Sequence, residues 1–166
     1  EDSYLSAFEN ISFEGSDDRQ EKPKGIGVWD TGCQEDFVEC SVEGEQEDKD
    51  ECYEMLAGWC DHPMPCGEIK DPILKDECYD DLANYDTEDA SICAYIQNVA
   101  MRDDCYHDVV VYDSHDYRYC ADIIDLEIRD DCYEDVADEL NDVSICYKIV
   151  DPEWRSDCIK YAPDID

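Results

Sequence analysis

The chain has 166 residues and carries 48 acidic against 12 basic side chains, a formal net charge of −36 at pH 7. A charge of this size repels nucleic acid and anionic membranes, so we expect neither as a partner. Membrane insertion is not expected either, because no apolar run approaches the roughly 20 residues that span a bilayer. The twelve cysteines include no Cys-x-x-Cys pair, which indicates disulfides formed in an oxidising compartment and predicts an extracellular or cell-surface protein.

Residues 1–30 lack cysteine and are predicted to form an N-terminal arm. The arm concentrates apolar side chains that have no core of their own: Tyr4, Leu5, Phe8, Ile11 and Phe13. We expect the arm to dock either on the groove of its own solenoid or on a neighbouring subunit, and the hypothesis for a polymer is docking on the neighbour. The alternative is a flexible acidic tail. Asn10 begins the sequence Asn-Ile-Ser and is therefore a candidate N-glycosylation site in a secreted protein.

Residues 31–166 are predicted to form one repeat domain of five units of about 27 residues. The first cysteine of each unit follows the last at a spacing of 26 or 27 residues: Cys40, Cys66, Cys93, Cys120 and Cys146. The second cysteine comes twelve residues after the first: Cys52, Cys78, Cys105, Cys132 and Cys158. Such a period predicts an elongated stack in which each unit contacts only its neighbours.

Each unit is expected to fold as two antiparallel helices. In the third unit Met101, Cys105 and Val109 recur at i, i+4 and i+8, which predicts an apolar helical stripe. This stripe leaves four residues for solvent: Arg102, Asp103, Asp104 and Asp108. The second helix of a unit should start at a capping side chain: Asp71, Asn98, Asp125 or Asp151. The predicted fold class is therefore all-α, a disulfide-stapled tandem repeat of helical hairpins, or α-solenoid, with an extended N-terminal arm.

The cysteine spacing favours pairing within each unit, because a midway turn brings the two cysteines of a hairpin level with each other. Pairing between units, for example Cys78 with Cys93, closes a loop of similar length and stays open as an alternative. Cys33 and Cys60 flank the first unit almost symmetrically, so we expect an outer bridge around the inner Cys40–Cys52 bridge. Each bridge within a unit should stabilise the fold by about 3 kcal/mol.

The sequence contains no pattern typical of an enzyme, and we expect none. It lacks the Cys-x-x-Cys-His of haem attachment and the closely spaced cysteines of structural zinc sites. The strongest local cluster of metal ligands is Asp113, His115 and Asp116, although it does not match the EF-hand spacing. We expect no cofactor other than Ca²⁺ or similar cations.

These features together predict a non-enzymatic extracellular structural protein. It would self-associate, as the repeating subunit of a surface filament or sheath, with its arm docked on the next copy. The alternative is a secreted acidic binding module for a basic protein or for cations.

Overall fold

The computed structural model describes residue 29 and residues 31–42 and 44–161, and within these ranges all regular structure is helical, with no strand. The predicted all-α class is therefore confirmed for the described part of the chain. None of the helices in these ranges combines the length and the apolar character that crossing a bilayer requires.

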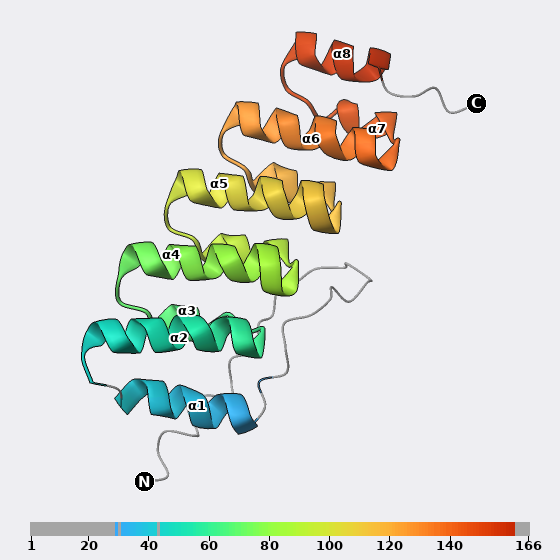
Figure 1. The fold of residues 1–166 in the computed structure, drawn as a ribbon. Helices are drawn as coiled ribbons and strands as arrows, with labels where there is room; N and C mark the ends of the chain where they lie inside the picture. Colours follow the sequence, from blue (N-terminus) through green and yellow to red (C-terminus); the bar gives the residue numbers. More distant parts are fainter. Residues whose placement is uncertain (1–28, 30, 43, 162–166) are drawn as a thin grey trace.

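The longer helices lie side by side in chain order in Figure 1, and the shorter ones lie behind them. The first two, α1 and α2, form a hairpin, and each later long helix is preceded by one short helix. The long helices are α1 (Thr31–Val42), α2 (Gln46–Cys60), α4 (Pro72–Asp81), α5 (Val99–Asp108), α6 (Leu126–Leu140) and α8 (Pro152–Tyr161). The short ones are α3 (Met64–Glu68), η3 (Ala90–Tyr95), η5 (Tyr117–Asp122) and α7 (Val143–Cys146).

Two of the long helices continue into a π-helical turn, α4 into η2 (Leu82–Thr87) and α5 into η4 (Val109–Ser114). The residue that follows each of four long helical segments has a left-handed backbone, with φ near 50°. These residues are Asp61, Glu88, His115 and Asn141. A left-handed residue ends a helix because it turns the chain out of the helical path.

The predicted caps start the long helices. The side chains of Asp71, Asn98 and Asp125 each accept hydrogen bonds from two backbone amides of the first turn. Asp151 does the same for α8, through the amides of Glu153 and Trp154. A capping side chain satisfies amides that have no partner inside the helix, which is why these positions carry Asp or Asn.

All twelve cysteines form disulfides, and the pairing within units is confirmed. Five bridges join cysteines twelve residues apart: Cys40–Cys52, Cys66–Cys78, Cys93–Cys105, Cys120–Cys132 and Cys146–Cys158. Cys33–Cys60 spans 27 residues and closes the outer bridge of the α1–α2 hairpin. The alternative pairing of Cys78 with Cys93 is thereby excluded.

The core of the described residues consists of apolar side chains that pack around these bridges. In four units the isoleucine three residues after the first cysteine is buried: Ile69, Ile96, Ile123 and Ile149. The longer helices add Leu56, Leu82, Val109 and Val136, also buried. Because each unit buries only a few such residues, hydrophobic burial is thin and the covalent bridges carry a large share of the stability.

Candidate functional site

Four buried aspartates, one in each of four predicted units, accept hydrogen bonds from backbone amides of the predicted unit that follows. The side chain of Asp103 in α5 accepts hydrogen bonds from the backbone amides of Ile124 and Asp125, at 3.1 and 2.8 Å. These two residues directly precede α6. Equivalent pairs of bonds are made by Asp50, Asp76 and Asp130. The sequence-based expectation that Asp103 faces solvent is wrong, because its side chain is only 1% exposed. We call these four residues the linking aspartates.

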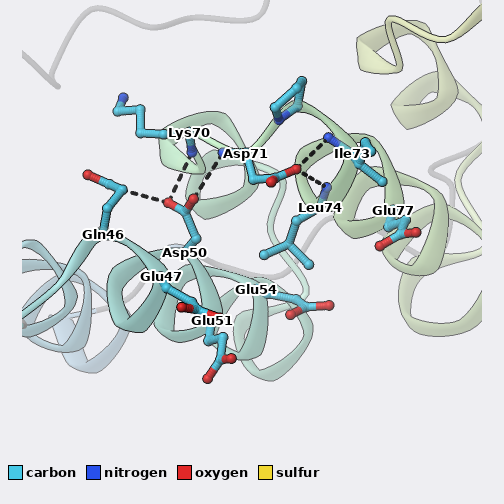
Figure 2. Close-up of a pocket in the computed structure, with 11 residues that line it drawn as sticks. Gln46, Glu47, Asp50, Glu51, Glu54, Lys70, Asp71, Ile73, Leu74 and Glu77 are labelled. Atoms are coloured by element: carbon cyan, nitrogen blue, oxygen red, sulfur yellow. Dashed lines mark hydrogen bonds between the residues drawn. The ribbon is translucent and has the colours of Figure 1, made fainter.

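Figure 2 shows the linking aspartate of the first unit, Asp50, between α2 and the segment that starts α4. Burial tends to raise the pKa of Asp50, but the amides of Lys70 and Asp71 and the side chain of Gln46 donate to the carboxylate and bring its pKa below the ordinary value. The charged form is therefore the one that the fold stabilises.

Beside this contact, α2 and α4 border a groove of about 840 Å³. Its lining is rich in carboxylates, of which Glu47, Glu51 and Glu54 lie along α2 and Glu77 lies on α4 (Figure 2). Burial and then repulsion from Asp81, Glu77 and Glu51 raise the pKa of Glu54. The groove thus concentrates negative charge between two units.

The same arrangement recurs between later units. In three units, the residue fourteen positions after the first cysteine faces two acids of the next unit. These acids lie eleven and fifteen positions after the first cysteine of that next unit. We call these sets the inter-unit clusters. They are Glu54 with Glu77 and Asp81, Asp80 with Asp104 and Asp108, and His107 with Asp131 and Asp135.

In the second cluster, burial followed by repulsion from Asp81, Asp108 and Asp104 raises the pKa of Asp80 to about 6, although the Asn84 amide partly opposes this shift. A carboxyl group with such a pKa is partly protonated in mildly acidic solution.

The third cluster differs because it contains an imidazole. His107 Nε2 lies 3.5 Å from Asp131 Oδ2 and 3.7 Å from Asp135 Oδ2, across the contact between α5 and α6. His107 Nδ1 lies 3.1 Å from Asp108 Oδ1. Burial, and then repulsion from Asp131, raise the pKa of Asp135, while His107 lowers it. Nε2 is buried and has no hydrogen-bond partner.

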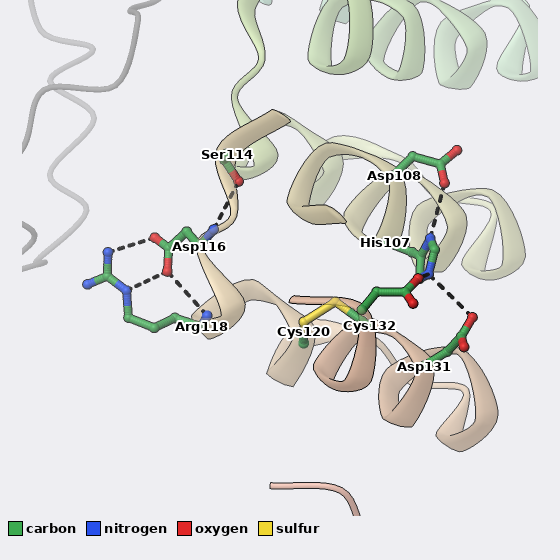
Figure 3. Close-up of a disulfide and its surroundings, with 9 residues drawn as sticks. His107, Asp108, Ser114, Asp116, Arg118, Cys120, Asp131 and Cys132 are labelled. Atoms are coloured by element: carbon green, nitrogen blue, oxygen red, sulfur yellow. Dashed lines mark hydrogen bonds and ion pairs between the residues drawn. A yellow bond between two sulfur atoms is a disulfide. The ribbon is translucent and has the colours of Figure 1, made fainter. Parts of the chain in front are cut away.

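The predicted ligand cluster of Asp113, His115 and Asp116 is not brought together as a ligand set. Asp116 instead binds the Arg118 guanidinium through both carboxylate oxygens, at 2.7 and 2.6 Å. His115 occupies the left-handed position at the end of η4. Within the described ranges, the one group of three potential ligands whose donor atoms all lie within 4.8 Å of each other is His107, Asp131 and Asp135. Figure 3 shows His107 and Asp116 on opposite sides of the Cys120–Cys132 disulfide.

Large exposed aromatic side chains recur in the last part of three helical segments, α2, η2 and η4. Trp59, Tyr85 and Tyr112 occupy the same position in three successive units, nineteen residues after the first cysteine, and are 87%, 80% and 70% exposed. They contrast with the tyrosines next to the second cysteines, which are buried: Tyr53, Tyr79, Tyr106 and Tyr133. We call the three exposed residues the aromatic row. Three such side chains at one repeated position form an apolar feature on a strongly acidic protein.

The predicted arm residues Tyr4, Leu5, Phe8, Ile11 and Phe13, and the candidate glycosylation site Asn10, lie outside the described residues.

Comparison with known proteins gives no relative: no protein-family model, no curated protein and no solved structure matches the chain.

Proposed function

We propose that the protein is a non-enzymatic structural subunit of the extracellular surface and that it assembles with copies of itself. In this proposal the units form an α-solenoid. Support comes from the linking aspartates, which give each of four consecutive unit boundaries the same pair of hydrogen bonds. Six disulfides support an oxidising, extracellular location, where such bridges persist.

The observation that carries the assembly proposal is the aromatic row. A soluble chain gains nothing from holding three large aromatic side chains in water at one repeated position, so a row of this kind is typical of a contact surface. The occupant that we propose is the N-terminal arm of a neighbouring copy, whose apolar residues Phe8 and Phe13 offer the matching chemistry. An arm that binds the next copy makes a head-to-tail contact that extends into a filament.

Electrostatics set a condition on this assembly. Subunits that each carry a charge of −36 repel one another, so association requires salt, divalent cations or low pH. The carboxylates of the inter-unit clusters are where such cations would gather. Assemblies should therefore loosen in chelator at low ionic strength.

Sedimentation velocity and electron microscopy of the full oxidised chain, with and without Ca²⁺, test the proposal. Replacing Tyr85 and Tyr112 together by Ser should abolish assembly, and so should replacing Phe8 and Phe13 together. The matched control is the replacement by Ser of Val99 and Val150, which are 45% and 53% exposed. Both lie near the start of a long helix, away from the aromatic row. Equal loss in all three variants, or monomers under every condition, would contradict the proposal.

A second candidate function is a secreted acidic module that binds a basic protein or cations. The glutamate-lined groove between α2 and α4 favours it, because such a surface complements a cationic ligand. This candidate predicts a monomer that binds a polylysine probe in a salt-dependent way and whose binding is unaffected by the Tyr85 and Tyr112 replacements.

A further inference from the structure

The imidazole of His107 lies among three carboxylates, and its Nε2 atom has no hydrogen-bond partner. Nδ1 lies 3.1 Å from Asp108 Oδ1, a distance at which the ring N–H donates to the carboxylate. In that tautomer Nε2 carries a lone pair, and the carboxylate oxygens of Asp131 and Asp135 lie 3.5 and 3.7 Å from it. Three groups that can only accept are thus gathered around one point, and a cation between them would remove the conflict.

The spacing suits a metal ion better than a proton. A proton on Nε2 would form a hydrogen bond to one of the oxygens, with a nitrogen–oxygen distance of about 2.7 to 3.2 Å. The observed distances of 3.5 and 3.7 Å are longer than this range. Ligand atoms bound at about 2.0 to 2.1 Å to a tetrahedral ion lie about 3.4 Å apart. The nitrogen–oxygen separations of this cluster are close to that value.

The ligand types narrow the choice of ion. Ca²⁺ and Mg²⁺ prefer all-oxygen sites, whereas an imidazole nitrogen with carboxylates favours zinc and similar transition ions. A metal-bound histidine almost always donates its other ring N–H to a carboxylate or carbonyl, which is the position of Asp108 here. The Nε2 atom is buried and has no hydrogen-bond partner, so its lone pair is available to an ion.

We propose that His107, Asp131 and Asp135 form a binding site for one Zn²⁺ or similar divalent transition ion, with Asp108 as the residue that orients the imidazole. Asp131 and Asp135 lie one helical turn apart on α6, so both reach the imidazole that projects from α5. Figure 3 shows Asp131 and His107 facing each other. The ion therefore ties the third unit to the fourth. The other two inter-unit clusters contain only carboxylates and do not share this preference.

Isothermal titration of the full oxidised chain with Zn²⁺, in excess Mg²⁺ to occupy oxygen-only sites, tests the proposal. One Zn²⁺ should bind per chain much more tightly than the remaining ions. His107→Gln and Asp135→Asn should each abolish this tight binding, and Asp108→Ala should weaken it by about tenfold. The matched control is His115→Asn, which alters the cluster predicted from sequence, keeps a side chain that tolerates the left-handed backbone, and should leave the binding unchanged.

Nitrogen NMR of the histidine side chains gives a second readout, since the chain has only three histidines. Zn²⁺ should shift the Nε2 signal of His107 and leave Nδ1 protonated. Three outcomes would overturn the proposal: wild-type affinity in folded His107→Gln or Asp135→Asn, equal loss in His115→Asn, or a His107 ring that stays doubly protonated after Zn²⁺ is added.

Discussion

The carboxylate of Asp103 accepts the backbone amide of Asp125 at 2.8 Å, and Asp125 in turn caps the first turn of α6. One unit thus fixes the residue that starts the long helix of the next unit. The amide of Ile124 donates to the other oxygen of Asp103, so a single side chain satisfies two backbone groups. Polar contacts therefore help to fix the position of each unit relative to the next, in addition to the packing of the core.

Replacing Asp103 by Ala should destabilise the fold by about 3 kcal/mol, because two charge-assisted hydrogen bonds are lost and two amides are left without a partner. Asp104→Ala removes the same charge from an exposed neighbouring position, where it also relieves repulsion on Asp80, and should therefore not destabilise the fold. Urea denaturation followed by circular dichroism at constant pH measures both variants. Equal midpoints for the two would contradict the role given to Asp103.

The helical class, the disulfide pairing and the caps could be predicted because each depends on local spacing. Twelve residues between Cys93 and Cys105 fit one hairpin, and Asp125 stands where a helix must begin. The helical stripe through Met101 and Cys105 also identifies one packed face. It misses the buried Asp103, because a helix between two neighbours is covered on more than one side.

The candidate metal ligands could not be found by the same reasoning. Asp113, His115 and Asp116 are close in sequence, but the left-handed turn at His115 and the pairing of Asp116 with Arg118 keep them from forming a ligand set. His107 and Asp131 are 24 residues apart in sequence and meet only because α5 packs on α6. The repeated acids at equivalent positions were visible in the sequence, but which of them face each other depends on how consecutive helices pack.

Replacing Asp125 by Ala should cost about 1 kcal/mol, since the amides of Glu127 and Ile128 lose the cap that holds them. Asp125→Ser keeps a capping oxygen and should recover most of the loss. The backbone amide of Asp125 remains in both variants, so its bond to Asp103 is unchanged. Thermal unfolding of both variants at one pH therefore measures the contribution of the capping oxygen alone. Equal destabilisation by Ala and Ser would contradict the capping role.

Reduction of the six disulfides should unfold the described helices at neutral pH and low salt. Five of the bridges close loops of about 13 residues, and each of these contributes about 3 kcal/mol. The buried apolar side chains of each unit are few, and the charge of −36 favours expansion of the chain. Far-ultraviolet circular dichroism with and without a thiol reductant measures the effect. A reduced chain that keeps its full helical signal would show that packing alone holds the fold.

Replacing Asp80 by Asn should stabilise the protein at pH 7. The folded state raises the pKa of Asp80 to about 6, through burial and the acids around it, whereas an unfolded aspartate titrates near 3.9. The folded state therefore binds the proton more tightly than the unfolded state does. The contribution of Asp80 to the free energy of unfolding is favourable below about pH 4 and is lost as the pH rises through 6.

Because Asp80 is only half-buried, solvent screening reduces the gain from Asp80→Asn at pH 7 to on the order of 1 kcal/mol. The gain should shrink towards pH 4, where the folded wild-type residue is already neutral. Asp157→Asn removes one charge at an exposed position of α8 and serves as the matched control. Urea midpoints for the three proteins at pH 4 and pH 7 measure the difference. If Asp80→Asn stabilises equally at both values, general relief of the net charge explains the effect, and the inter-unit cluster does not.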